Sequence, residues 1–218
     1  MGISIQNISK SYDGKTVLQN FSQELHEGGI YCLMGPSGAG KTTLLRILMG
    51  LEHADKGAVR WKVKAVGMVG EKDADDLSIT QGFCAAGKQP LVSIVFQENR
   101  LLDFADAVKN IRFVEGKQGL LFQSEEVLEN LLEKTDWYRP VRELSGGMQR
   151  RVAIGRALAA RSELLLMDEP FTGLDEGTKE RVVQTVLKYR NGRTLLVVTH
   201  QEEDVQLLGA EAVYLSGN

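Results

Sequence analysis

The sequence predicts an α/β fold built around a mainly parallel β-sheet. Its short, nearly uninterrupted apolar runs are typical of strands that are buried on both faces. The carboxyl ends of parallel strands meet at one edge of a sheet, where binding crevices form. We therefore expect one site beside the ends of these runs, which span 30–34 before Gly35, 92–96 before Gln97, 164–167 before Asp168 and 195–199 before His200.

The start of the chain predicts a small antiparallel β lobe. Residues 3–8 alternate apolar and polar side chains, as an edge strand of such a lobe does. Asp13 and Gly14 are a turn signal, so residues 12–17 are expected to form the corner of a hairpin. Residues 69–90 contain several glycines and acids, and we expect them to be a surface insertion in this lobe.

Helices are expected over residues 42–49, which Gly50 would end, and across most of 98–144. The clearest helical pattern covers 124–135, where leucines and a valine recur at helical spacing after two acids. The expected architecture is a single domain over residues 1–218 that includes a helical subdomain at about 98–160.

Composition excludes several classes of function. The 218 residues are 43% hydrophobic and carry a formal net charge of −3, so no bulk positive charge points to nucleic acid. Cys32 and Cys84 lie far apart and the three histidines are scattered, which favours a reduced cytoplasmic chain over a disulfide scaffold or a metal cluster. We find no leader peptide and no apolar run of about 18 residues, so a membrane role is expected to come through a partner.

A glycine-rich loop follows the first buried run and matches the phosphate-binding pattern G-x-x-x-x-G-K-[ST]. Glycines let the backbone curl so that successive N–H groups face an anion, and the following helix adds its dipole. Lys41 supplies a full positive charge to the β- and γ-phosphates, and the Thr42 hydroxyl suits Mg²⁺. The expected phosphate-binding residues are Gly35, Pro36, Ser37, Gly38, Ala39, Gly40, Lys41, Thr42 and Thr43.

Two acids stand at the end of another buried run. Asp168 closes the run 164–167 and is expected to help hold the metal ion beside the phosphate loop. Glu169 follows directly, so its carboxylate is placed to orient and polarise an attacking water.

Residues 144–149, Leu-Ser-Gly-Gly-Met-Gln, resemble the LSGGQ signature of ABC ATPases, with Met148 where glutamine is commonest. Ser145 is an N-cap candidate, and Gly146 and Gly147 free the backbone at the start of a helix whose dipole points outward. In the family this helix end closes on the nucleotide held by the other subunit, which makes Ser145, Gly146 and Gly147 expected ATP contacts.

Other residues resemble the same family in their order along the chain. Tyr12 stands where an aromatic ring stacks on adenine, and Gln97 where a glutamine touches Mg²⁺ and water. Asp175 lies in Gly-Leu-Asp, which resembles the D-loop, and His200 matches the histidine that contacts the γ-phosphate. The resemblance spans about residues 3–215 and is weakest at the expected insertion.

The resemblance implies the ABC ATPase fold, the cofactors ATP and Mg²⁺, and a catalytic set of Lys41, Gln97, Glu169 and His200. It also implies a head-to-tail homodimer on the cytoplasmic face of the cell membrane, bound to separate transmembrane permease subunits. Residues 97–102 resemble importer ATPases of the nitrate, sulfonate and taurine type, which implies an extracytoplasmic solute-binding protein in the full system.

Four other interpretations compete with an importer ATPase. The ATPase subunit of an exporter would share these motifs. ABC ATPases of DNA repair or chromosomes usually carry long coiled coils, and the sequence contains no sustained heptads. Translation-associated ABC proteins normally hold two cassettes, whereas one phosphate loop is present. A regulatory module without turnover would not need Glu169 and His200.

Overall fold

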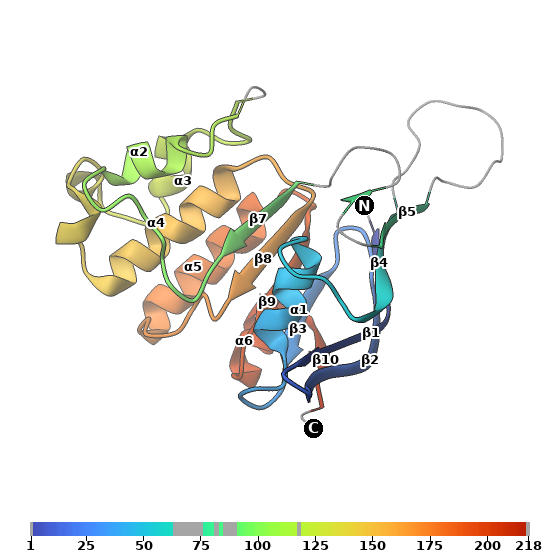
Figure 1. Ribbon diagram of the computed structural model, residues 1–218. Coiled ribbons are helices and arrows are strands. Elements are labelled where there is room, and N and C mark those ends of the chain that lie inside the picture. Colours follow the sequence, from blue (N-terminus) through green and yellow to red (C-terminus); the bar gives the residue numbers. More distant parts are fainter. Residues whose placement is uncertain (1, 63–75, 81–82, 85–90, 117–118, 217–218) are drawn as a thin grey trace.

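The computed structural model describes residues 2–62, 76–80, 83–84, 91–116 and 119–216. They form two β-sheets with helices packed around them (Figure 1), which confirms the predicted α/β fold. The core sheet is parallel throughout and has the order β10-β3-β9-β8-β7. Its strands are β3 (Ile30–Met34), β7 (Val92–Val95), β8 (Leu164–Asp168), β9 (Thr194–Val198) and β10 (Glu211–Tyr214).

The second sheet is antiparallel and has the order β2-β1-β4-β5-β6. Asp13 and Gly14 join β1 to β2 with φ of 49° and 79°, the two positive values that a tight hairpin turn requires. The expected insertion at 69–90 falls largely outside the described residues. Its described residues belong to β5 (Asp76–Thr80) and β6 (Phe83–Cys84) at one edge of this sheet, and the other strands are β1 (Gly2–Tyr12), β2 (Lys15–Leu25) and β4 (Lys56–Lys62).

The helices cover both faces of the core sheet. Two helices, α1 (Lys41–Leu48) and α6 (Glu202–Leu208), follow β3 and β9, and α5 (Glu176–Tyr189) lies between β8 and β9 in the chain. The segment between β7 and β8 stands to one side of the sheet in Figure 1, and its helices before residue 145 are short, so the prediction that most of 98–144 is helical was wrong. It contains α2 (Ala107–Arg112), α3 (Ser124–Leu128), α4 (Gly146–Ala159) and two 3₁₀ turns, η1 (Lys134–Asp136) and η2 (Val141–Glu143).

The hydrophobic core has two halves, one on each face of the parallel sheet. Along β8, Leu165 and Met167 join the half that includes α2 to α5, whereas Leu164 and Leu166 join the half formed with α1 and the antiparallel sheet. Side chains alternate between faces along a strand, so a strand that is buried on both faces must be apolar throughout.

The helix expected over 124–135 is shorter than its sequence pattern. It ends after Leu128, and the chain turns so that Leu131 and Leu132 are both buried. The carbonyl of Leu131 accepts from Arg151 Nη1 at 2.9 Å, and that of Leu132 accepts from Trp137 Nε1 at 3.1 Å. Side-chain donors therefore replace the backbone donors that a longer helix would have supplied.

A buried arginine, Arg193, connects several elements of the core by hydrogen bonds. Arg193 is 7% exposed, and burial lowers the pKa of its guanidinium to about 10. Its nitrogens donate to the carbonyls of Leu158 at 2.8 Å, Tyr189 at 2.7 Å, Arg190 at 2.8 Å and Ala160 at 2.9 Å. One side chain thus joins the end of α4, the end of α5 and the start of β9.

We predict that Arg193→Met lowers the free energy of unfolding by about 2–4 kcal/mol, because several buried carbonyls lose their donors. The midpoint and slope of urea unfolding, followed by circular dichroism, measure the change. Arg139→Met is the matched control: Arg139 is half exposed and pairs with Asp136, so its loss is expected to cost under about 1 kcal/mol. Equal effects of the two substitutions would contradict the prediction.

Candidate active site

The loop between β3 and α1 is shaped by glycines. Gly38 and Gly40 have φ of 81° and 92°, which side chains rarely permit. A Cβ at Gly40 would lie 2.7 Å from Leu18 Cδ2 and 2.9 Å from the Val17 carbonyl oxygen, because β2 packs directly against the loop. Gly40 caps α1 without a side-chain hydrogen bond, so the first N–H groups of α1 are left for an anion.

Lys41 is held by the loop itself. Its Nζ donates to the carbonyls of Gly35 at 2.7 Å and Pro36 at 2.9 Å. The N–H of Ala39 donates to the same Pro36 carbonyl at 3.2 Å, which closes the turn. The ammonium group is therefore at the mouth of the loop, where the helix dipole and its own charge both favour phosphate.

Asp168 lies against the first turn of α1. The Thr42 hydroxyl reaches Asp168 Oδ2 at 3.5 Å, and the carboxylate is 7% exposed. Burial raises the pKa of Asp168, and the neighbouring Glu169 carboxylate raises it further. A hydroxyl and a carboxylate in an electronegative setting suit a small divalent cation with oxygen ligands. The described residues contain no group of three His, Cys, Asp or Glu side chains that could hold a metal ion by themselves.

Glu169 and His200 face each other beyond the ends of β8 and β9. Glu169 has a φ of 47°, so the chain turns sharply after Asp168, and its N–H donates to the Val198 carbonyl at 2.9 Å. His200 Nδ1 lies 3.5 Å from Glu169 Oε1, and the imidazole is 57% exposed. A carboxylate and an imidazole this close can act on the same bound group.

These elements surround one cavity of about 280 Å³. Gln97, which follows β7, also lies on its wall. The structure thus brings most of the predicted phosphate, metal and water residues together. The cavity is lined by Val17, Ser37, Gly38, Gly40, Lys41, Thr42, Thr43, Gln97, Asp168 and Glu169.

Ser145, Gly146 and Gly147 form a separate group at the start of α4. Ser145 Oγ accepts from the N–H of Met148 at 3.3 Å, as the predicted N-cap should. Figure 1 shows this end of α4 well separated from α1. Its neighbour is the start of α5, because a Cβ at Gly147 would lie 3.5 Å from Leu174 Cδ2.

Asp175 and Tyr12 also lie off the cavity wall. Asp175 Oδ1 caps α5 by accepting from the N–H of Thr178 at 3.0 Å, and hydrogen bonds to Thr178 lower the pKa of this carboxylate. Tyr12 is exposed at the tip of the β1–β2 hairpin, with Lys10 Nζ 5.3 Å from its ring centroid. The assigned roles of both residues stay predictions.

Sequence reasoning missed two arginines of α4 that hold the loop after β7. Arg150 is buried and donates to the carbonyls of Phe96 and Gln97, and Arg156 donates to those of Asn99 and Arg100. Burial lowers the pKa of Arg150, although Asp168 and Glu169 act in the opposite direction. The available signal was a set of three arginines, Arg150, Arg151 and Arg156, in the otherwise apolar part of α4 after Gln149.

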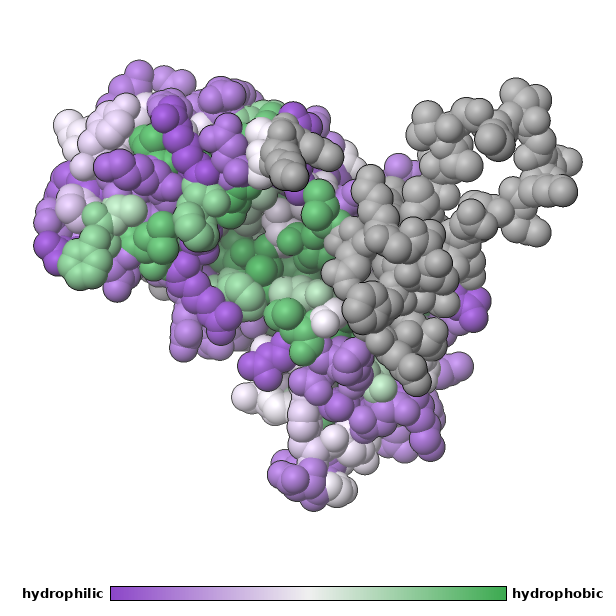
Figure 2. Space-filling view, turned by 45° about the horizontal axis from the view of Figure 1, so that its top comes forward, coloured by the Kyte–Doolittle hydropathy of each residue, from purple (hydrophilic) through white to green (hydrophobic). Residues whose placement is uncertain are grey.

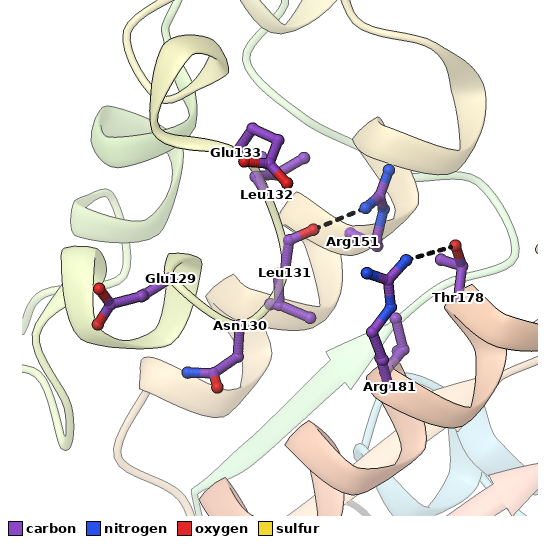
Figure 3. A pocket seen from close by; sticks show the side chains of 9 residues that line it. Glu129, Asn130, Leu131, Leu132, Glu133, Arg151, Thr178 and Arg181 are labelled. Carbon is purple, nitrogen blue, oxygen red and sulfur yellow. Dashed lines mark hydrogen bonds between the residues drawn. The ribbon is translucent and has the colours of Figure 1, made fainter.

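A smaller polar pocket lies between the 129–133 turn and α5 (Figure 3). Arg151 and Arg181 are on one side of it, bonded to the Leu131 carbonyl and to Thr178. Glu129 and Glu133 also line it, so its charge is mixed. A triphosphate fits the glycine loop better, because that loop offers N–H groups and a lysine together.

Comparisons with known proteins agree with this geometry. Residues 18–172 match the ABC transporter family. An aliphatic sulfonates import ATP-binding protein of Burkholderia cenocepacia is 33% identical over 96% of this chain and 72% of its own length. A sulfate/thiosulfate import ATP-binding protein of Xanthomonas campestris is 34% identical over 100% of this chain and 62% of its own length.

Solved structures agree as well. The dimeric structure of a bacterial ABC transporter cassette superposes with a TM-score of 0.75 at 28% identity, covering 98% of this chain and 94% of that one. A dimeric post-hydrolysis state of an ATP-binding cassette, bound to ADP and Pi, superposes with a TM-score of 0.74 at 29% identity and the same coverage. The chain therefore belongs to the ABC transporter family, as an ATP-binding subunit that hydrolyses ATP.

Proposed function

We propose that two copies of this chain hydrolyse ATP at shared sites and so power the import of a small solute through a separate membrane permease. One observation carries the proposal. The phosphate loop, Asp168, Glu169 and His200 meet at one edge of the core sheet, whereas Ser145 to Gly147 stand apart on the helical segment. A nucleotide that touches both groups must lie between two chains.

ATP is proposed to bind with its phosphates on residues 35–43 and its adenine ring against Tyr12. Stacking needs only an aromatic face, and Tyr12 is exposed enough to offer one. Mg²⁺ fits the oxygen donors of Thr42, Asp168 and Gln97, all on the wall of one cavity. When bound, Mg²⁺ would offset the charge of the phosphates and of the paired acids.

Hydrolysis is proposed to use Glu169 as the group that orients and polarises water. Its carboxylate lines the cavity beside Asp168. His200 is close enough to Glu169 to contact the γ-phosphate from the same side. Lys41 would exchange its two carbonyl acceptors for phosphate oxygens, a stronger charge-assisted pairing.

The second copy is proposed to contribute Ser145, Gly146, Gly147 and Asp175 in a head-to-tail arrangement. The N-terminal end of α4, fourteen residues long, carries a helix dipole suited to a γ-phosphate. Leu174 lies next to this end, so the segment that contains Asp175 would reach the same interface.

The permease is proposed to bind a groove of about 270 Å³ on the outer side of the same cavity. Met49, Ile94 and Phe96 give this groove apolar walls, and Leu51 is exposed at its rim. Figure 2 shows hydrophobic side chains gathered in the hollow across this face. No helix among the described residues is long and apolar enough to cross a membrane. We infer that an apolar segment of the permease fills the groove at the cytoplasmic face.

The direction of transport is inferred from the relatives, which are named import ATP-binding proteins for sulfonates and for sulfate or thiosulfate. An extracytoplasmic solute-binding protein is proposed to deliver the solute. Membrane vesicles that hold the co-purified permease, with solute outside or inside, would decide between import and export.

Lys41→Ala is predicted to weaken ATP binding by about tenfold to a hundredfold, because it removes the charge that faces the phosphates. Isothermal titration with ATP and Mg²⁺ measures the change. Lys109→Ala is the control, since Lys109 is exposed and pairs with nearby Asp106. Normal ATP affinity in Lys41→Ala would refute the assignment of the loop.

Glu169→Gln is predicted to bind ATP normally and to lower kcat by at least about a hundredfold, because an amide cannot polarise water as a carboxylate does. The variant should also accumulate as a dimer in the presence of ATP. Phosphate release and size-exclusion chromatography measure the two effects. A wild-type rate would move the role to another group, with His200 the next candidate.

Ser145→Arg is predicted to keep the ATP affinity of each monomer but to abolish both turnover and the ATP-dependent dimer in a Glu169→Gln background. A bulky cation at the start of α4 would block the partner's γ-phosphate. Mixing Ser145→Arg with Lys41→Ala should restore part of the activity, since one of the two shared sites then carries neither substitution. Loss of ATP binding by the Ser145→Arg monomer would contradict the shared site.

A further inference from the structure

A buried lysine links α5 to the loop that carries His200. The Lys179 side chain is only 6% exposed. Its Nζ lies 2.6 Å from Asp204 Oδ1, and it donates to Gln201 Oε1 at 2.8 Å and to Glu203 Oε2 at 2.5 Å. Burial alone would lower the pKa of this ammonium group, but Asp204 and Glu203 outweigh that effect and raise it. Lys179 is therefore a charged group in the interior.

Its partners all follow His200 in the chain, and Asp204 also connects them to Thr199, the residue before His200. Asp204 is as buried as the lysine, whereas Glu203 is half exposed and its pairing is screened by water. The Thr199 hydroxyl donates to Asp204 Oδ2 and accepts from the N–H of Gln201. The residues before and after His200 therefore belong to one hydrogen-bonded unit, whose cation comes from α5.

The position of the His200 imidazole depends on the backbone that this hydrogen-bonded unit holds. Its imidazole is more than half exposed, so few neighbours restrict it, and its contact with Glu169 is as long as 3.5 Å. A shift of the loop backbone would therefore move the imidazole directly relative to the Glu169 carboxylate.

The other end of the link is Asp175, the N-cap of α5. The N–H of Lys179 donates to the Asp175 carbonyl at 2.8 Å, so the two residues are one helical turn apart. We propose that Lys179 is a positioning residue for ATP hydrolysis, because it ties the position of Asp175 to that of His200 in the same chain. The inference rests on the proposed function, in which both residues act at nucleotide sites.

The test compares Lys179→Met with Lys188→Met, a control in the same helix at an exposed position. Lys179→Met is expected to lower kcat by at least about tenfold, because small displacements of a catalytic group are costly. The rate is counted per ATP-binding site found by titration, and the Kd for ATP should change less than about twofold, as remote substitutions do. Lys188→Met should match the wild type, and Lys179→Arg, which keeps the cation, should recover most of the rate.

Lys179→Met leaves Asp204 buried without its cation, which can unfold the protein. The double variant Lys179→Met/Asp204→Leu removes both charges and is expected to fold, to bind ATP and to show the same loss of kcat. Wild-type kcat in the double variant would overturn the inference. A parallel loss of ATP affinity and kcat would also overturn it, because that pattern indicates general damage to the site.

His200→Ala separates the two levels of the argument. If His200→Ala keeps the wild-type kcat, the role proposed for His200 in hydrolysis is wrong. If it loses activity while Lys179→Met keeps the wild-type kcat per site, the role of His200 stands and the positioning role of Lys179 is wrong.

Discussion

Burial of the parallel sheet on both faces is the constraint on which the site depends. Along β8, residues 164–167 are fully buried, and the first polar side chain comes at Asp168. After its first residue, Thr194, β9 is likewise apolar up to Val198, and Thr199 and His200 follow. Since β7, β8, β9 and β3 are parallel neighbours, their polar residues emerge at a common edge. The proposed catalytic groups, which are far apart in the chain, are thereby gathered at one edge of the sheet.

The acidic and the basic side chains at that edge have different surroundings. Burial and the neighbouring Glu169 carboxylate raise the pKa of Asp168, so the acidic side is prepared for a cation. The Lys41 ammonium group donates to carbonyls of its own loop, and these hydrogen bonds hold the loop in its conformation before a phosphate binds. Preorganisation of this kind lowers the cost of ordering the site when the nucleotide binds.

Sequence patterns predicted the strands and the local motifs well, because both depend on short-range rules. The buried runs, the Asp13-Gly14 turn and the N-cap at Ser145 are set by residues within a few positions of one another. Contacts between residues that are far apart in the sequence could not be predicted. The helix after Ser124 ended early, and the carbonyls of Leu131 and Leu132 beyond it accept from Arg151 and Trp137, neither of which is signalled within the helix.

In the candidate site, too, local features could be predicted from the sequence and long-range contacts could not. The residues of the phosphate loop, Asp168, Glu169 and Gln97 could be placed at one cavity because each follows a buried strand. The supports of the site, such as Arg150 and Lys179, could not be found in this way. A buried charge looks the same in a sequence as an exposed one until its partner, which here lies more than twenty residues away, is known.

Arg150 and Arg156 hold residues 96–100 through main-chain oxygens and not through the side chains of that loop. Every residue has a carbonyl, so this anchorage does not depend on which amino acids occupy the loop. Substitutions there can alter the surface offered to a membrane partner while the path of the backbone stays the same. Substitutions in such a loop would allow one ATPase architecture to bind different permeases in the proposed function.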